Sequence, residues 1–230
     1  MPCFIPKHNI KAYENDSLIN IAVDYYEAHG NDEDRFYAYL YQGIIGYLLN
    51  DYTSASVSLF RSMQNGTGVS DPYSKGQLYL HLANIMTLQR CAEATEYAHK
   101  AYEEYTAGNL FSKATNALMI EAISYLRVED YSSCRQILHE GIERARMTDD
   151  YRELCNFLSV EAQYAVMTDS LVLAETIYKE LSTLEDWECS DQDYENLAII
   201  ASKQHDAETA LACLRKAEPL IASLNDTLHF

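Results

Sequence analysis

The residue types that carry out acid–base, nucleophilic or metal chemistry are present, but they form no recognised arrangement. Seven histidines and six cysteines are scattered over 230 residues, and His139-Glu140 lacks the second histidine of the zinc-peptidase motif H-E-x-x-H. Cys155 and His139 could act as a nucleophile and a base, but no orienting motif surrounds either. Adjacent carboxylates such as Glu103-Glu104 point about 100° apart on a helix, so they do not share a proton. We therefore expect a non-enzymatic protein without a metal or cofactor, whose histidines and cysteines are packing or surface residues.

A second set of polar residues recurs at regular intervals. Gln77, Asn116, Asn156 and Gln192 follow one another at spacings of 39, 40 and 36. A primary amide offers two hydrogen-bond donors and an acceptor. If these amides share one surface, they could bind the backbone of an extended peptide whatever its side chains are. The alternative is a polar surface on which the amides bind water or the neighbouring structural unit.

Composition and charge restrict the partners. Hydrophobic residues make up 48% and charged residues 23% of the chain, which are globular proportions, and only 4 Pro and 8 Gly are present. The 17 Lys and Arg against 35 Asp and Glu give a net charge of −18, which argues against nucleic acid and against an anionic membrane surface. This charge indicates either simple solubility or attraction to a basic partner. No stretch approaches the roughly 20 apolar residues of a membrane span, and residues 1–6 do not resemble a secretory signal.

The sequence repeats itself with a period close to 40 residues. The repeated position is the residue that opens the second helix of each predicted hairpin, at spacings of 39, 40, 40 and 36: Tyr52, Cys91, Tyr131, Leu171 and Ala207. Three residues later a small residue stands each time: Ala55, Ala94, Cys134, Ala174 and Ala210. Seven residues after the opening residue come Leu59, Ala98, Leu138, Tyr178 and Leu214. A stripe with this spacing is one face of an α-helix, and its small residues let a neighbouring helix approach closely.

A first helix precedes each of these second helices. Its mark is a small residue eight or nine positions before the opening residue: Gly43, Ala83, Ala122, Ala162 and Ala198. Short polar turns separate the two helices: Asn50-Asp51, Gln89-Arg90, Glu129-Asp130, Asp169-Ser170 and His205-Asp206. These features predict five hairpins at about 34–64, 73–106, 112–147, 151–184 and 191–224, preceded by a helix from Asp16 to Ala28. Because a single hairpin cannot bury both its faces, we predict one stacked all-α domain over residues 16–230, after an N-terminal extension at 1–15.

The repeated marks resemble those of the tetratricopeptide repeat. Asp51-Tyr52-x-x-Ala55-x-x-x-Leu59 is the best match to the family pattern Tyr-x-x-Ala-x-x-x-(Phe/Leu), and the stretches from Asp130 and Ala207 come next. The period near 40 exceeds the family norm of 34 residues, so the helices should be about one turn longer, and the usual closing proline is missing. The resemblance covers about residues 33 to 224. It implies a right-handed α-solenoid and is specific for the fold, not for a ligand.

A narrower resemblance lies near the start of the chain. The segment Asn15 to Gly30, followed by Asp34-Arg35 and Tyr39-x-x-Gln-Gly43, is similar to tetratricopeptide proteins abundant in Bacteroidetes. Those proteins are typically exported, as lipoproteins or as the sensing part of membrane-bound regulators, and they have further sequence before the segment that corresponds to Asn15. The resemblance implies a periplasmic or cell-envelope protein whose signal is absent from this chain. The alternative is a cytoplasmic protein.

The tetratricopeptide resemblance also predicts where a partner binds. In that family the second, fifth, ninth and twelfth positions of the first helix face a concave groove. The groove residues predicted here are Tyr37, Tyr47, Gln77, Asn84, Asn116, Arg127, Asn156, Gln163, Gln192 and Lys203. Tyr41 and Tyr47 could be aromatic anchors or could only pack between hairpins. We expect the groove to bind a peptide or protein segment, either in an exported sensing or assembly scaffold or in the sensor of an intracellular transcriptional regulator whose DNA-binding part is absent from this chain.

Overall fold

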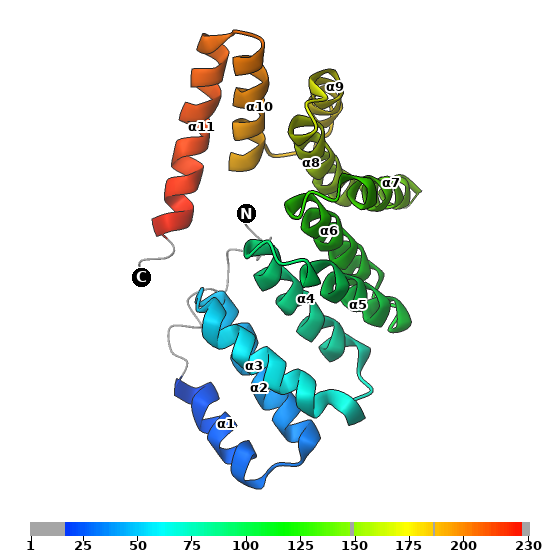
Figure 1. Ribbon diagram of the computed structural model, residues 1–230, viewed down its shortest axis with the longest axis vertical. Helices are drawn as coiled ribbons and strands as arrows, with labels where there is room; N and C mark the ends of the chain where they lie inside the picture. Colours follow the sequence, from blue (N-terminus) through cyan, green and yellow to red (C-terminus); the bar gives the residue numbers. More distant parts are fainter. Residues whose placement is uncertain (1–16, 148–149, 186, 227–230) are drawn as a thin grey trace. The chain divides into compact units, whose positions relative to one another are not determined.

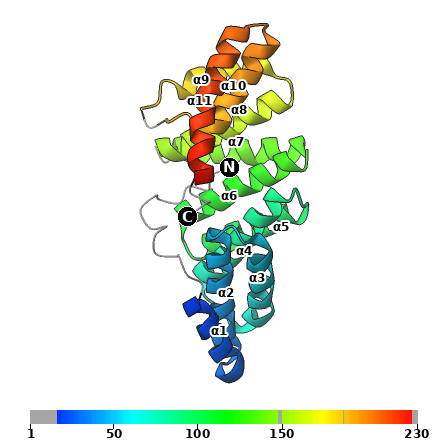
Figure 2. The same cartoon turned by 90° about the vertical axis from the view of Figure 1, so that its left-hand side faces the viewer.

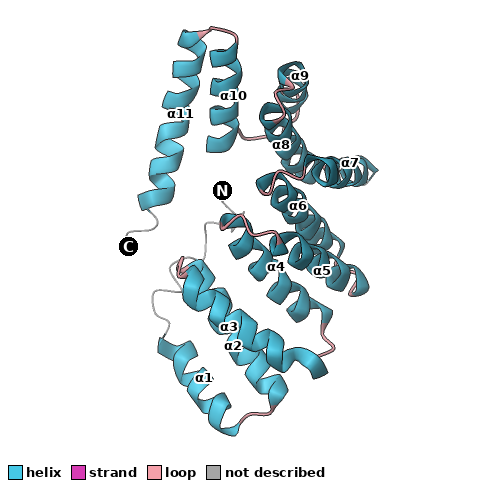
Figure 3. Ribbon diagram, in the orientation of Figure 1, coloured by secondary structure: helices cyan, strands magenta, loops and turns pink. Residues whose placement is uncertain are grey.

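The computed structural model describes residues 17–147, 150–185 and 187–226 of the chain. Within these residues the chain forms eleven α-helices and one 3-10 turn, and no β-strand occurs in this part of the chain (Figure 1, Figure 3). The prediction of an all-α fold is therefore confirmed. The predicted N-terminal extension at 1–15 lies outside the described residues.

The helices follow the predicted hairpins closely. They are α1 (Ser17–His29), α2 (Asp32–Leu48), α3 (Tyr52–Asn65), α4 (Pro72–Leu88), α5 (Glu93–Ala107), α6 (Phe111–Arg127), α7 (Tyr131–Met147), α8 (Tyr151–Met167), α9 (Leu171–Leu181), α10 (Asp191–Lys203) and α11 (Ala207–Asp226), with the 3-10 turn η2 at Gly66–Gly68. The first helices α2, α4, α6 and α8 are each 17 residues long, which accounts for much of the long period.

The chain divides into two compact units between Val128 and Glu129, in the turn that follows α6. The predicted hairpin at 112–147 therefore contributes one helix to each unit. In unit 1, α2 packs on α3, α4 on α5 and α5 on α6, and the first helices α2, α4 and α6 contact one another in succession. In unit 2, α7 packs on α8, α8 on α9 and α10 on α11, while α8 also contacts α10 (Figure 2).

The repeated small residues lie where the helices touch. Ala55, Ala94, Cys134 and Ala174 on the second helices have no exposed surface. Their counterparts on the first helices are also buried: Gly43, Ala83, Ala122, Ala162 and Ala198. The stripe is less buried in α11, where Leu214 is 49% exposed although Ala217 is buried. Both sets of predicted positions are thus buried in the first four hairpins.

Each turn within a hairpin contains one residue in the left-handed backbone conformation. These residues are Asn50, Arg90, Glu129, Asp169 and His205, with φ between 54° and 64°. This conformation lets the following N–H groups bond back to the end of the preceding helix, as the Asp51 N–H does to the Gly46 carbonyl at 2.9 Å. The predicted polar turns are therefore confirmed, although only one of the five positions carries the asparagine that tolerates this conformation best.

The second hairpin departs from the prediction at the start of its second helix. We predicted that Cys91 opens this helix, but α5 begins at Glu93. In the first hairpin Asp51 lies between the left-handed residue and Tyr52, and its side chain caps α3. Cys91 instead follows Arg90 directly, and no side chain caps the N-terminus of α5. The missing cap residue explains why the helix starts two residues later.

Aspartate side chains cap α3 and α4. The carboxylate of Asp51 accepts the Ser54 N–H at 3.0 Å, and that of Asp71 accepts the Ser74 hydroxyl at 2.6 Å and the Ser74 N–H at 3.1 Å. These bonds stabilise the charged form of each carboxylate. The hydrogen bonds from Ser54 and Ser74 therefore lower the pKa of Asp51 and of Asp71, respectively.

We predict that Asp71→Ala lowers the free energy of unfolding by about 1 kcal/mol at neutral pH, because the start of α4 loses its acceptor. Since the folded-state pKa of Asp71 is lowered, its contribution is present above the ordinary value of 3.8 and is lost as the pH falls through the folded-state pKa. Urea unfolding should show that the variant loses less unfolding free energy, relative to the parent, at pH 3 than at pH 7. Asp71→Asn, which keeps a capping oxygen, is the control. An equal deficit at both pH values would contradict the charged cap.

Candidate recognition surface

The first helices present the recurring amides. Gln77 lies on α4 and Asn116 on α6 in unit 1, and Asn156 lies on α8 and Gln192 on α10 in unit 2. Asn116 is exposed and the other three are half-buried. Because α4 contacts α6 and α8 contacts α10, each unit holds one pair of amides on neighbouring first helices.

Three of the four amides have unused hydrogen-bonding capacity. The side chains of Gln77, Asn116 and Asn156 make no hydrogen bond to any residue that the structure describes. The Gln192 amide donates to the Glu195 carboxylate at 3.3 Å on its own helix. None of the four amides bonds to a neighbouring hairpin among the described residues. The alternative that they bind the next hairpin therefore has no support in this part of the chain.

Buried polar contacts hold the first helices of each pair together. In unit 1 the hydroxyls of Thr87 on α4 and Ser124 on α6 lie 2.6 Å apart in the interior. In unit 2 Asp193, at the start of α10, accepts the Ser159 hydroxyl of α8 at 2.6 Å and the Tyr178 hydroxyl of α9 at 3.3 Å. A buried polar group with satisfied hydrogen bonds fixes the register of the helices that carry it. These contacts fix the two first helices that carry the amides of each unit against each other, and the sequence analysis did not identify them.

Two predicted groove residues are packed between helices instead. Asn84 on α4 is only 9% exposed, so the prediction that it faces a groove does not match its burial. The Tyr47 ring lies 5.0 Å from the His81 ring of α4 and 5.7 Å from the Tyr52 ring. Burial lowers the pKa of His81 to about 4, so its imidazole is neutral at pH 7. Of the two interpretations of Tyr47, packing between hairpins is the one that the structure favours.

Of the other aromatic candidates, Tyr41 is exposed and Tyr37 is half-buried against the core. Tyr37 and Tyr41, one turn apart on α2, stack with their ring centroids 6.5 Å apart, and Tyr41 is 49% exposed. Such a ring pair offers apolar area together with polar hydroxyl groups. It is suited to be an aromatic anchor at the start of unit 1.

The remaining three candidates differ in what they can offer a partner. Gln163 on α8 and Arg127 at the end of α6 are half-buried, and neither forms a hydrogen bond or ion pair with a described residue. Lys203 at the end of α10 pairs with Asp169 in the turn between α8 and α9, and both side chains are exposed. Exposed pairs of this kind contribute little stability, so Lys203 could exchange its partner readily.

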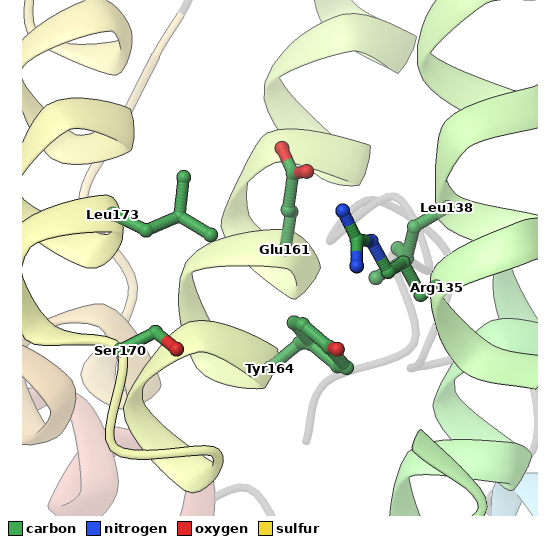
Figure 4. Close-up of a pocket in the computed structure, with 6 residues that line it drawn as sticks. All are labelled: Arg135, Leu138, Glu161, Tyr164, Ser170 and Leu173. Atoms are coloured by element: carbon green, nitrogen blue, oxygen red, sulfur yellow. The ribbon is translucent and has the colours of Figure 1, made fainter. Parts of the chain in front are cut away.

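A hollow of about 340 Å³ lies elsewhere in unit 2 (Figure 4). It is lined by Arg135 and Leu138 of α7, Glu161 and Tyr164 of α8, and Ser170 and Leu173 at the start of α9. Glu161 is five residues beyond Asn156, which places the two about 140° apart around α8. None of the amide residues lines this hollow, so it is separate from the predicted groove.

The structure presents no grouping typical of a metal centre in the part of the chain that it describes. No set of three or more His, Cys, Asp or Glu side chains there could hold a metal ion. Five described cysteines are not joined in disulfides: Cys91, Cys134, Cys155, Cys189 and Cys213. Among the described helices, none combines the length and apolar composition needed to cross a membrane.

Comparison with known proteins supports the fold. No family model matches the sequence, and no curated protein matches it either. Among solved structures, the chain is similar to BtubC (BKLC) from P. vanneervenii, with a TM-score of 0.64 and 13% identity over 94% of this chain and 91% of that chain. It is also similar to a Signal Transduction ATPase with Numerous Domains (STAND) protein with a tetratricopeptide repeat sensor from Pyrococcus horikoshii, with a TM-score of 0.69 and 16% identity over 95% of this chain and 36% of that chain. The chain therefore has an all-α helical-repeat fold.

Proposed function

We propose that this chain is a non-catalytic recognition module that binds an extended peptide or protein segment along its first helices. One observation carries the proposal. Gln77, Asn116 and Asn156 occupy the same position of consecutive repeats, none is buried, and none bonds to a described residue. Amides left unbonded at a regular spacing are suited to pair with another chain's backbone, which itself presents one donor and one acceptor per residue.

The charge of the chain favours a basic segment as the partner. A net charge of −18 accelerates association with a cation-rich chain and disfavours an acidic one. The amides supply contacts that do not depend on the partner's side chains, while Tyr37 and Tyr41 can hold one side chain of the partner against their rings.

We further propose that the module is the sensing or assembly part of a larger bacterial protein. Similarity to a protein with a tetratricopeptide repeat sensor supports a sensing role. The resemblance of the segment from Asn15 to Gly30 to exported Bacteroidetes proteins supports a periplasmic or envelope setting. The second candidate is the peptide-sensing domain of an intracellular regulator. The STAND protein offers a parallel, because the region similar to this chain is only part of that longer protein.

Binding to an array of 12-residue peptides of varied charge tests the recognition role. We expect a subset of basic peptides to bind, and the variant Gln77→Ala/Asn116→Ala/Asn156→Ala/Gln192→Ala to bind them about tenfold more weakly with unchanged helicity, because it loses the amide donors and acceptors. Fluorescence anisotropy gives the affinities and circular dichroism the helicity. Gln64→Ala/Gln136→Ala, which removes two exposed amides from second helices, is the matched control. Equal affinity of the quadruple variant and the parent would refute the amide surface.

A further inference from the structure

The hollow in unit 2 contains a carboxylate that the described residues leave without a hydrogen bond. Glu161 of α8 lines the hollow and is half-buried, and its side chain forms no hydrogen bond or ion pair with a described residue. Burial raises the pKa of Glu161, whereas the charges of Arg146 and Arg135 act to lower it. The Arg146 guanidinium is already paired with the Glu180 carboxylate at 2.9 Å. A half-buried carboxylate in this setting is stabilised by any further cation that reaches it.

Arg135 of α7 brings the opposite charge to the same hollow. Figure 4 shows the Arg135 guanidinium and the Glu161 carboxylate directed into one space. Arg135 forms no hydrogen bond or ion pair with any residue that the structure describes, so the two groups do not bond to each other. A guanidinium presents its N–H donors in a planar fork that matches the two oxygens of a carboxylate. The hollow therefore offers one site for a cation and one for a carboxylate.

Two hydroxyl groups add hydrogen-bonding capacity to the hollow. The Tyr164 hydroxyl bonds to no described residue, and its ring is held edge-on against the Tyr131 ring with the centroids 6.1 Å apart. The Ser170 hydroxyl accepts the Thr168 hydroxyl at 3.4 Å and caps no N–H group of α9. A hydroxyl can both donate and accept hydrogen bonds. Tyr164 and Ser170 can therefore bind further donors of a cationic group that reaches Glu161.

The volume and the apolar lining of the hollow restrict the size of its occupant. A volume of about 340 Å³ lies at the lower end of the range of about 300–1,000 Å³ that is usual for ligand sites. Leu138 is only 1% exposed, whereas Leu173 is 42% exposed. Covering the exposed part of Leu173 with an apolar group is favourable. These features fit a small molecule with one apolar group rather than a long stretch of peptide.

We propose that this hollow binds a small zwitterion of the α-amino acid class with an aliphatic side chain. Glu161 binds its ammonium group, Arg135 binds its carboxylate, and the aliphatic group covers Leu173. A ligand with only a positive charge would be repelled by Arg135, and one with only a negative charge by Glu161. A zwitterion avoids both repulsions. The site is separate from the recurring amides, so it does not depend on the proposed peptide binding.

Isothermal titration calorimetry of the full chain with L-leucine, L-isoleucine, L-valine and L-methionine tests the proposal. We expect at least one of them to bind with a Kd of about 1 mM or below, as befits a small ligand in a partly open site. The N-acetyl and the amide derivatives of that amino acid each lack one charge and should bind at least about tenfold more weakly. Absence of binding by all four amino acids would overturn the proposal, and so would equal binding of either derivative.

The variants Glu161→Gln and Arg135→Gln place the ligand in the hollow. Each keeps the side chain polar and removes one charge, so each should weaken the binding by about tenfold with unchanged helicity. Arg135 is exposed, so its variant tests the proposal even if Glu161→Gln does not fold. Arg144→Gln is the matched control, because Arg144 is nine residues further along α7 and hence about 180° around it. The proposal is refuted if Arg135→Gln binds like the parent, or if Arg144→Gln loses as much affinity as Arg135→Gln.

Discussion

Ala55→Asp is expected to unfold unit 1, or to lower its free energy of unfolding by more than about 3 kcal/mol. Ala55 has no exposed surface and lies where α2 and α3 approach closely. A Cβ atom added to Gly46 of α2 would lie 3.2 Å from the Ala55 Cβ, and one added to Gly43 would lie 3.2 Å from the Ala55 carbonyl oxygen. There is no room for a carboxylate or its water, so the substitution buries an unpaired charge. Urea unfolding followed by circular dichroism measures the loss.

Val57→Asp on the same helix separates burial from the effect of a charge in a helix. The Val57 side chain is 50% exposed, so this variant should stay within about 0.5 kcal/mol of the parent. Ala55→Ser, which adds one small polar atom, should fall between the two. If Ala55→Asp unfolds at the same urea concentration as Val57→Asp, then the contact between α2 and α3 is more open than the structure shows.

The sequence predicts the helices and turns well because both depend on local and periodic features. Ala55, Ala94 and Ala174 occupy equivalent positions, and each is small because the backbone of a neighbouring helix passes close to it. The same residues therefore reveal both the helix period and the packed face. The exception is the start of α5, where no side chain caps the helix and the helix begins only at Glu93, so that aligning on Cys91 misplaces the helix start.

The interior polar contacts could not be read from the sequence in the same way. Thr87 pairs with Ser124, 37 residues away, and His99 with Glu121, 22 residues away. Which residues meet depends on how far one hairpin slides along the next, and the repeat period does not specify this offset. Asn84 shows the consequence, since its predicted position faces the groove but the actual packing of α4 buries it. Burial and register thus decide which residues of a predicted face are available to a partner.

The amide surface was found from its position in the repeat, for a physical reason. Residues that pack the interior must be apolar or satisfied, so their types follow from stability. Gln77, Asn116 and Asn156 lie outside that interior and form no bond to a described residue, so the packing seen in the structure does not require their amides. Their recurrence at one repeat position is therefore the basis of the proposal that they bind a partner.

Gly141→Ala is expected to destabilise unit 2 by about 2–3 kcal/mol, although alanine normally favours a helix over glycine by up to about 1 kcal/mol. A Cβ atom on Gly141 of α7 would lie 2.1 Å from the Phe157 ring of α8. Phe157 is only 1% exposed, so its ring has no free space to enter. A Cβ atom added to Gly76 of α4 would lie 2.4 Å from the buried Tyr105 ring of α5, so Gly76→Ala should act in the same direction. In both units a glycine thus provides the space that an aromatic ring from the partner helix fills.

Urea unfolding of Gly141→Ala against Gly68→Ala isolates this steric cause. Nothing lies within 4 Å of a Cβ on Gly68, so that variant should change the free energy of unfolding by less than about 0.5 kcal/mol. Phe157→Leu alone leaves a cavity and should destabilise unit 2, but the shorter side chain also removes the clash with the methyl group that Gly141→Ala introduces. The double variant should therefore lose less than the sum of the two single losses, since residues in contact are not additive. Full additivity would mean that Gly141 and the Phe157 ring do not share this space.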